Sequence, residues 1–340
     1  MHSRNIVFPE PGAVEIRKEQ VPAPGRGEVL CRASQSLVSL GTESHCLRGV
    51  YDPGTYWEEY IRFPFRPGYS MAARVLAIGE GVTRHSVGDR VTSWATHSEH
   101  FLAAEDQVFP VPDGITDDVA MWATLARTTQ LGARRAELEL GETAVVVGLG
   151  ILGQLVTQYL KLSGARQVIA VDTSEKRLSL ALANGATHAI NRTADQALET
   201  VVDITNGTKA DCVFDITGHP AVLAPASQLL RKLGRLILLG DTPTPSRQAL
   251  GPRIVGDSIA ILGIHGFMYP QVSTPFNQWT AEAMTSLFFD YIASGRMNVD
   301  SLITHRFSPL EAEEVYKVVA KDQGAALGVV FDWSRLPTDQ

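Results

Sequence analysis

The sequence predicts an α/β protein in which a doubly wound parallel sheet follows a β-rich unit. Residues up to about 125 are dense in Gly and Pro and carry short alternating apolar runs, such as 29–33 and 73–78. That pattern is typical of an all-β, barrel-like unit. From about 126 to 265 strand and helix patterns alternate, which favours a parallel sheet with crossover helices. The tail from about 266 predicts a helix at 311–321 and a last strand at 327–331.

The middle segment supplies six strand candidates. The first, 145–147, runs into a glycine-rich turn and a helix whose apolar positions recur at helical spacing from Ile151 to Leu160, with Gly164 as its stop. The second, 168–171, ends at Asp172. The remaining four are 187–190, 212–215, 235–239 and 259–264. Six strands joined by helices define a doubly wound sheet.

The glycine-rich turn has the G-x-G-x-x-G spacing of a dinucleotide-binding fingerprint. Gly148 lets the strand turn sharply, Gly150 lets the backbone approach a pyrophosphate, and Gly153 lets the helix pack closely on the sheet. The helix begins at Ile151 and Leu152, where unpaired N–H groups face the phosphates. The strand, turn and helix around the glycines predict a nucleotide cofactor.

Asp172 lies at the end of the second strand, about twenty residues beyond the last glycine. Its carboxylate can accept hydrogen bonds from both hydroxyls of the adenosine ribose. The same charge repels a 2′-phosphate, so the sequence favours NAD over NADP.

Composition excludes several classes of protein. The chain has 340 residues and a net charge of -7, without a basic cluster, so we expect no nucleic-acid partner. Its three cysteines show no paired spacing, which fits a reducing cytoplasm. The first residues lack the apolar core of a signal peptide, and no apolar run is long enough to span a bilayer. We therefore expect a cytoplasmic protein that acts on a small-molecule substrate without a membrane partner.

Several short motifs give the chain a family resemblance. They are Gly41-Thr42-Glu43, Pro67-Gly68-Tyr69, Gly-Glu-Gly-Val at 79–82, and Val-Gly-Asp-Arg-Val at 87–91 ahead of the glycine fingerprint. With these motifs the chain resembles the medium-chain dehydrogenase/reductase family, the zinc alcohol and polyol dehydrogenases, over nearly its whole length. The resemblance implies a GroES-like β-barrel catalytic domain at 1–125 and 266–340, and a Rossmann NAD-binding domain at 126–265.

The zinc positions of that family are altered here. Leu40 stands where a Cys precedes the G-[ST]-[DE] motif, Tyr69-Ser70 replaces a His-Glu pair, and Thr124 aligns with a third ligand. Leu40 has no donor atom, and neutral hydroxyls are poor zinc ligands. The four-Cys lobe of a structural zinc is absent as well. We therefore expect a zinc-independent enzyme.

Another group must then exchange the proton. The resemblance places Thr42 and His45 at the family's proton-relay positions and Glu43 at a carboxylate near the metal. Tyr69 replaces a ligand, so its hydroxyl is expected to donate to a carbonyl or, with a lowered pKa, to accept an alcohol proton. Packing for Tyr69, and a structural acceptor role for Glu43, are the alternatives.

The resemblance also assigns residues around the cofactor and substrate. Those expected to contact NAD besides the fingerprint are Thr128, Arg177, Gly240, Ile264 and His265. Aromatic residues of the loop after His45 are expected to shape a substrate pocket: Tyr51, Tyr56, Trp57 and Tyr60. His97, Glu99 and His100 form an H-x-E-H cluster whose spacing matches no standard metal site.

Together these features predict an NAD-dependent oxidoreductase that interconverts a secondary alcohol and its ketone. Gly-Thr-Glu followed by Pro-Gly-Tyr-Ser is similar to a subgroup that includes the bacteriochlorophyllide hydroxyethyl dehydrogenase, so a tetrapyrrole side chain and a polyol or sugar are both possible substrates. The alternatives are an NADPH-dependent quinone or enone reductase and a nucleotide-binding protein without catalysis. The apolar last strand, 259–264, predicts pairing between copies in a homodimer or a dimer of dimers.

Overall fold

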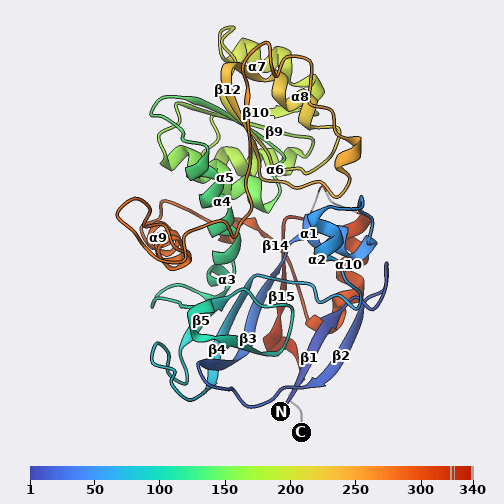
Figure 1. The fold of residues 1–340 in the computed structure, drawn as a ribbon, viewed down its shortest axis with the longest axis vertical. Helices are drawn as coiled ribbons and strands as arrows, with labels where there is room; N and C mark the ends of the chain where they lie inside the picture. Colours follow the sequence, from blue (N-terminus) through green and yellow to red (C-terminus); the bar gives the residue numbers. More distant parts are fainter. Residues whose placement is uncertain (322–323, 325, 338–340) are drawn as a thin grey trace. The chain divides into compact units, whose positions relative to one another are not determined.

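In the computed structural model the chain forms two compact units (Figure 1). The structure describes residues 1–321, 324 and 326–337. The first unit comprises Met1–Val50, Glu58–Leu125 and Thr285–Gln340, and the second comprises Tyr51–Trp57 and Ala126–Met284.

The first unit is built on a seven-stranded sheet in the order β14-β15-β3-β4-β5-β7, with β6 also paired to β3. All its ladders are antiparallel except the parallel pair β14–β15. A separate antiparallel ladder joins β1 to β2. The strands of this unit are β1 (His2–Val7), β2 (Glu15–Gln20), β3 (Glu28–Val38), β4 (Met71–Ile78), β5 (Arg90–Ser93), β6 (His100–Ala104), β7 (Val108–Pro110), β14 (Ile303–Phe307) and β15 (Gly328–Asp332).

The second unit is a parallel six-stranded sheet in the order β10-β9-β8-β11-β12-β13. This is the doubly wound arrangement that the alternating strand and helix patterns predict. Its strands are β8 (Thr143–Val147), β9 (Gln167–Asp172), β10 (His188–Asn191), β11 (Ala210–Asp215), β12 (Leu230–Leu238) and β13 (Ala260–Gly263).

Apolar side chains cover both faces of this second sheet. Along β8, Val146 packs into one buried cluster while Val145 and Val147 pack into another. The first cluster holds residues of helices α4 (Ala123–Arg135), α5 (Ile151–Leu162) and α6 (Glu175–Ala183), and the second holds residues of α7 (Leu198–Ile204) and α8 (Leu223–Gln228). Because both faces are covered, the strands read as continuous apolar runs rather than as alternating ones.

The helices are short to medium in length, and some begin with a side-chain cap. Ser174 caps α6, and Ser308 with Glu311 forms a capping box ahead of α10. The helices are α1 (Leu40–Arg48), α2 (Tyr56–Tyr60), α3 (Asp117–Ala120), α4 (Ala123–Arg135), α5 (Ile151–Leu162), α6 (Glu175–Ala183), α7 (Leu198–Ile204), α8 (Leu223–Gln228), α9 (Ala281–Ala293) and α10 (Ala312–Lys321). Among the described residues no helix is long and apolar enough to cross a membrane.

The structure refines two boundaries. Strand β12 begins at Leu230 rather than at 235, and it continues through an irregular turn in which Leu233 has φ 61°. Segment 266–284 still packs on the second unit, because Trp279 lies 3.2 Å below the Arg134 guanidinium and the Met284 carbonyl accepts a hydrogen bond from Gln130. The chain therefore returns to the first unit at 285, beyond the predicted domain boundary at 266.

Candidate active-site residues

The glycine turn after β8 has the geometry that its spacing predicts. Gly148 adopts φ 90°, and a Cβ there would lie 2.7 Å from Thr217 Cγ2. A Cβ on Gly153 would lie 2.0 Å from the Gly148 carbonyl oxygen, so only glycine lets α5 approach the turn this closely. At Gly150, the N-cap of α5, a Cβ would meet nothing within 4 Å. The turn thus leaves room for a phosphate beside the first N–H groups of α5, from Ile151 and Leu152.

Asp172 is held at the end of β9 by two backbone donors. Its Oδ2 accepts from the Leu149 N–H at 2.7 Å and its Oδ1 accepts from the Ser174 N–H at 2.8 Å. Arg177, on α6, places Nη1 4.0 Å from the Asp172 Oδ2. The structure therefore brings the predicted ribose acid and the predicted Arg177 together beside the glycine turn.

The other predicted cofactor residues lie at strand ends of the same unit. A Cβ on Gly240 would lie 2.4 Å from both the Gly218 nitrogen and the Ile216 oxygen, so the turn after β12 is closely packed. Ile264 is buried after β13, whereas His265 is exposed. Thr128 comes close to this segment, because a Cβ on Gly266 would lie 2.4 Å from the Thr128 Oγ1.

In the first unit, Tyr69 is buried with its hydroxyl among other hydroxyls. The Tyr69 hydroxyl donates to Ser39 Oγ at 2.5 Å and lies 3.3 Å from Thr42 Oγ1. Its ring stacks on Trp94, with centroids 4.6 Å apart and planes at 19°. Tyr69 and Thr42, both assigned to proton exchange, are in contact, while Ser39 and Trp94 are partners that the motifs did not indicate.

The pKa of Tyr69 agrees with its expected role as a hydrogen-bond donor and contradicts its expected role as a proton acceptor. Burial raises its pKa to about 12, and the hydrogen bonds with Ser39 and Thr42 offset only part of this effect. A phenol with that pKa stays protonated at neutral pH. The lowered pKa that a proton-accepting Tyr69 requires is therefore wrong, and the geometry supports Tyr69 as a hydrogen-bond donor.

Glu43 is a buried acceptor rather than a base that faces a substrate. Its Oε1 accepts from the Ser39 N–H at 2.8 Å, and its Oε2 accepts from the Tyr316 hydroxyl at 2.5 Å. The same Oε2 lies 3.1 Å from His97 Nε2. Glu43 is 1% exposed and has three hydrogen-bond partners. It therefore acts as a structural hydrogen-bond acceptor, which is the alternative role stated above, and this corrects its assignment as a catalytic residue.

His97 links this carboxylate to the turn that carries Tyr69. Its backbone N–H donates to the Pro67 carbonyl at 2.8 Å, and a Cβ on Gly68 would lie 2.6 Å from that same nitrogen. Ser36 Oγ lies 2.8 Å from His97 Nδ1 and accepts from the Trp333 indole at 2.9 Å. Since the indole can only donate, the Ser36 hydroxyl proton is available to His97 Nδ1, and the Nε2–H then donates to Glu43.

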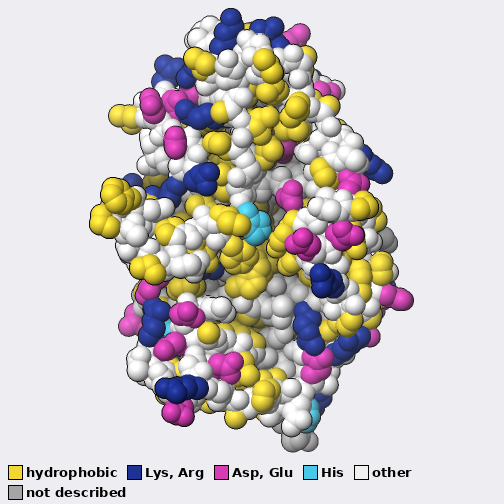
Figure 2. All heavy atoms as spheres, in the orientation of Figure 1, with side chains coloured by type: hydrophobic (Ala, Val, Ile, Leu, Met, Phe, Trp, Pro, Cys, Tyr) yellow, Lys and Arg dark blue, Asp and Glu magenta, His cyan; other side chains and the backbone are white. Residues whose placement is uncertain are grey.

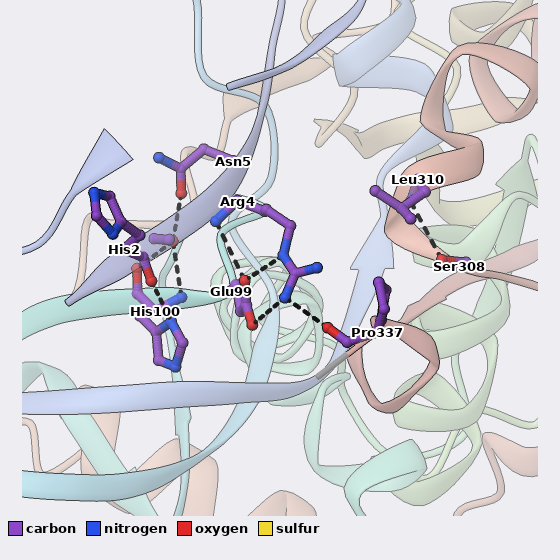
Figure 3. A network of polar contacts seen from close by, with 9 residues as sticks. His2, Arg4, Asn5, Glu99, His100, Ser308, Leu310 and Pro337 are labelled. Atoms are coloured by element: carbon purple, nitrogen blue, oxygen red, sulfur yellow. Dashed lines mark hydrogen bonds and ion pairs between the residues drawn. The ribbon is translucent and has the colours of Figure 1, made fainter. Parts of the chain in front are cut away.

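The other two members of the H-x-E-H cluster tie the sheet to strand β1 (Figure 3). Glu99 accepts from the Arg4 guanidinium at 2.7 and 3.1 Å, and His100 Nδ1 lies 3.1 Å from the His2 carbonyl oxygen. His97, Glu99 and His100 therefore serve three separate contacts. Within the described part of the chain, no group of three or more His, Cys, Asp or Glu side chains could hold a metal ion.

Thr42 and His45 lie one turn apart on α1. Thr42 contacts the Tyr69 hydroxyl, whereas His45 Nδ1 accepts from Arg48 Nη2 at 2.8 Å and is half-buried. Sequence reasoning found both residues but not Arg48.

The positions that would hold zinc do not fit the metal. Leu40 begins α1 with a side chain that has no donor atom. Tyr69 is a neutral phenol already bonded to Ser39, and Thr124 is a buried hydroxyl. Zinc requires anionic thiolate or carboxylate ligands or neutral imidazole, and these three side chains supply none.

The aromatic loop divides between the two units. Tyr56 and Trp57 group with the second unit, where Tyr56 packs edge-on against His265 at 5.1 Å. Tyr60 instead packs edge-on against Phe65 of the first unit at 5.3 Å. The structure thus assigns Tyr60 to packing in the first unit, whereas Tyr56 stays beside the strand ends of the second.

Comparison with known proteins agrees with the fold. The model of the alcohol dehydrogenase GroES-like domain matches residues 25–130, and that of the zinc-binding dehydrogenase family matches residues 152–282. The L-threonine 3-dehydrogenase of Pyrococcus furiosus is 28% identical, over 92% of this chain and 93% of its own length. The chain belongs to the medium-chain dehydrogenase/reductase family, and it is an oxidoreductase of the dehydrogenase type.

Solved structures share the fold over nearly the full length. One described as a short chain alcohol dehydrogenase, from Escherichia coli CFT073 and complexed with NADH, has a TM-score of 0.80 and 21% identity, covering 98% of this chain and 99% of that one. A zinc-binding dehydrogenase from Sinorhizobium meliloti 1021 bound to NADP has a TM-score of 0.79 and 18% identity, with the same coverage. These neighbours bind different nicotinamide cofactors, so the fold alone leaves the choice between NAD and NADP open.

Proposed function

We propose that this protein is a zinc-independent, NAD-dependent dehydrogenase that interconverts a secondary alcohol and its ketone. The observation that carries the proposal is the neutral, buried Tyr69 hydroxyl at a position where relatives would hold a metal ligand. A positioned donor of this kind stabilises the charge that develops on a reacting carbonyl oxygen. The proposal places the protein in the cytoplasm, consistent with three buried thiols that form no disulfide.

The residues around the glycine turn fit a dinucleotide. Gly148, Gly150 and Gly153 would place the pyrophosphate on the N-terminus of α5, and Asp172 would accept the ribose hydroxyls. Bound NAD supplies the hydride-accepting nicotinamide carbon. The carboxylate of Asp172 disfavours a 2′-phosphate, although Arg177 at 4.0 Å offsets part of that repulsion. We expect NAD(H) to bind more tightly than NADP(H) in a calorimetric titration; tighter NADP(H) binding would contradict this part of the proposal.

Tyr69 is proposed to orient the substrate oxygen and to exchange its proton. In the direction of ketone reduction, the protonated phenol donates a hydrogen bond to the carbonyl oxygen. Thr42, 3.3 Å from the phenol, and His45, one turn further along α1, would return the proton from solvent. The steps at Tyr69 and Thr42 use neutral hydroxyls, and the raised pKa of Tyr69 keeps its hydroxyl neutral.

A homodimer or a dimer of dimers is proposed from the edge of the second sheet. Strand β13 ends the strand order and exposes apolar residues. Beyond it, hydrophobic side chains gather around the loop beside α9, where Phe276, Val272 and Met268 are 100%, 74% and 69% exposed (Figure 2). Exposed apolar surface of this kind marks an interface. Light scattering is expected to give a multiple of 36.9 kDa, and a single-chain mass would contradict the dimer.

The experiment that tests the catalytic proposal is Tyr69→Phe. Wild-type protein is screened for NAD reduction with secondary alcohols, polyols and hydroxyalkyl aromatics. Loss of one positioned acid–base group typically lowers kcat by about 10²- to 10⁴-fold. The dissociation constant of NAD should not change, because Tyr69 lies in the other unit from the glycine turn. Wild-type turnover by Tyr69→Phe would return Tyr69 to a packing role.

A further inference from the structure

Residues 332–337 form a short segment that is held at both ends on the first unit. Strand β15, which leads into the segment, pairs antiparallel with β3. The chain turns after this strand, and the Asp332 carboxylate accepts from the Ser334 N–H at 3.1 Å. At the other end, the Pro337 carbonyl accepts from the Arg4 guanidinium at 3.0 Å (Figure 3). The side chains between these two anchors are therefore fixed against the sheet.

Trp333 is the large buried side chain of this segment. It is 2% exposed, and its indole N–H donates to Ser36 Oγ at 2.9 Å. Ser36 Oγ also lies 2.8 Å from His97 Nδ1. Because an indole can only donate, it occupies a lone pair of the Ser36 oxygen and leaves the hydroxyl proton to be donated to His97. Phe331, the residue before Trp333, meets the His97 ring edge-on with centroids 5.0 Å apart.

His97 in turn holds Tyr69 by two routes. Its backbone N–H donates to the carbonyl of Pro67, two residues before Tyr69, at 2.8 Å. Its Nε2 lies 3.1 Å from Glu43 Oε2, and Glu43 Oε1 accepts from the Ser39 N–H at 2.8 Å. Ser39 Oγ then accepts from the Tyr69 hydroxyl at 2.5 Å. A displaced His97 would therefore disturb both the backbone turn before Tyr69 and the acceptor of its hydroxyl.

Burial prevents solvent from repairing a break in this series of hydrogen bonds. Ser36, His97 and Glu43 are each at most 1% exposed, so water does not replace a partner that is lost. All members of the series, from Trp333 to Tyr69, belong to the first unit. A change at the Trp333 end is therefore passed along the series towards Tyr69.

We propose that Trp333 is a positioning residue for Tyr69 and acts through Ser36 and His97. Its indole orients the Ser36 hydroxyl, the hydroxyl holds the His97 ring, and His97 holds the turn and the acceptor of Tyr69. The consequence for catalysis rests on the proposed function, in which the Tyr69 hydroxyl orients the substrate oxygen. The placement of Tyr69 by Trp333 rests only on the hydrogen bonds within the first unit.

The first test is a double-mutant cycle in kcat, measured with NAD and the best secondary alcohol of the screen. Trp333→Phe keeps a ring and removes the indole donor, and Ser36→Ala removes the hydroxyl. A misplacement of about 1 Å costs about 100-fold in rate, so each single variant should lower kcat roughly 10- to 100-fold with little change in KM. Because the indole acts only through Ser36, the double variant should have the kcat of Ser36→Ala alone. Losses of kcat that multiply would overturn the proposal.

Trp122 offers a matched control for the lost ring volume. It lies in the same unit, is 0% exposed, and its indole nitrogen has no hydrogen-bond partner among the described residues. Trp122→Phe should therefore lower the Tm through lost packing and keep the wild-type kcat. Equal losses of kcat in Trp122→Phe and Trp333→Phe would show that any smaller ring in this core lowers activity, and the positioning role of Trp333 would be wrong.

The second test observes Tyr69 without any turnover. The protein is labelled with fluorotyrosine, and the Tyr69 signal in the fluorine NMR spectrum is the one missing from Tyr69→Phe. We expect this signal to shift or broaden in Trp333→Phe and in Ser36→Ala, and to stay unchanged in Trp122→Phe. Ser36→Ala breaks the same hydrogen bond without altering the Trp333 ring, so it tests the link even if Trp333→Phe does not fold. An unchanged Tyr69 signal in Ser36→Ala would overturn the proposal.

Failure of this inference is distinct from failure of the proposed function. If Tyr69→Phe loses activity while Trp333→Phe and Ser36→Ala keep the wild-type kcat, the proposed function stands and the role of Trp333 is wrong. If no alcohol is turned over but the Tyr69 signal moves in both Trp333→Phe and Ser36→Ala, the positioning of Tyr69 stands without the reaction.

Discussion

The two units position their functional residues in different ways. In the second unit, the glycine turn and Asp172 lie within about 25 residues of chain, and backbone geometry alone brings them together. In the first unit, the position of Tyr69 depends on hydrogen bonds among Ser39, Glu43 and His97. That network in turn includes Tyr316 and Trp333, which lie far along the chain. A turn that is set by local backbone geometry shows in the sequence as a spacing of residues, whereas a network of buried side chains leaves no such spacing.

The largest effect is expected at the glycine turn. A Cβ at Gly153 would lie 2.0 Å from a backbone oxygen, so Gly153→Ala must shift α5 or the turn, at a cost of about 3 kcal/mol or more. We expect a lower Tm and no measurable NAD binding by calorimetry. Gly150→Ala is the matched comparison, because its Cβ meets no protein atom. It should keep the Tm and weaken only NAD binding; equal Tm values for both variants would contradict the close packing at Gly153.

The second effect addresses the buried network of the first unit. His97→Phe keeps a ring but leaves Glu43 without one of its three partners, and a buried acceptor that loses a donor costs about 1–3 kcal/mol. The unfolding free energy should fall by that amount in denaturant titration. The kcat should fall as well, with little change in KM, because Tyr69 loses its fixed position.

His100→Phe serves as the control for His97→Phe. His100 is a buried histidine three residues further along the chain, at the start of β6, but it contacts the His2 carbonyl at the N-terminal strand instead. The kcat of His100→Phe should remain that of wild type. Equal losses of kcat in the two variants would show that any perturbation of this region lowers activity, and the positioning role of His97 would be wrong.

The third prediction concerns pH and the phenol of Tyr69. Its pKa is raised from 10.0 to about 12, so the folded state binds this proton more tightly than the unfolded state does. The resulting stability is complete below about pH 10 and is lost as the pH rises towards 12. Across that range wild type should lose roughly 2–3 kcal/mol more unfolding free energy than Tyr69→Phe. Parallel losses in both proteins would contradict a buried, protonated Tyr69.

The smallest effect is expected from removing metal. Since Leu40, Tyr69 and Thr124 cannot form a zinc site, overnight treatment with a chelator should leave both activity and Tm unchanged. Elemental analysis of the purified protein measures the same property directly. One tightly bound zinc per chain would overturn the zinc-independent mechanism.

Sequence patterns predicted the second unit almost completely. The six strands followed from six apolar runs, and the glycine turn followed from three residues whose backbone needs are local. The first unit was predicted only through motifs. Glu43, Thr42 and Tyr69 were identified, but the protonation of Tyr69 was left open because burial, which raises its pKa, is a tertiary property.

The missed residues share one physical reason. Ser39, Tyr316 and Trp333 act through single long-range hydrogen bonds, and a lone Ser, Tyr or Trp has no spacing that marks such a bond. His97 did carry a signal, the H-x-E-H cluster, but the spacing of that cluster matches no standard metal site and indicates no other role. Only the fold shows that its three members face three different partners.

Strand pairing also sets the order in which the molecule can assemble. The second unit is nearly continuous in sequence, so it can fold as soon as residue 284 has been synthesised. The first unit cannot be completed then, because β3 must pair with β15, whose residues are 328–332. The Ser36 hydroxyl can accept its hydrogen bond from the Trp333 indole only after Trp333 has been synthesised. The Glu43 carboxylate likewise can accept from the Tyr316 hydroxyl only after Tyr316 has been synthesised. A nascent chain would therefore acquire its nucleotide-binding unit first and its ordered Tyr69 only after residue 333 has been synthesised.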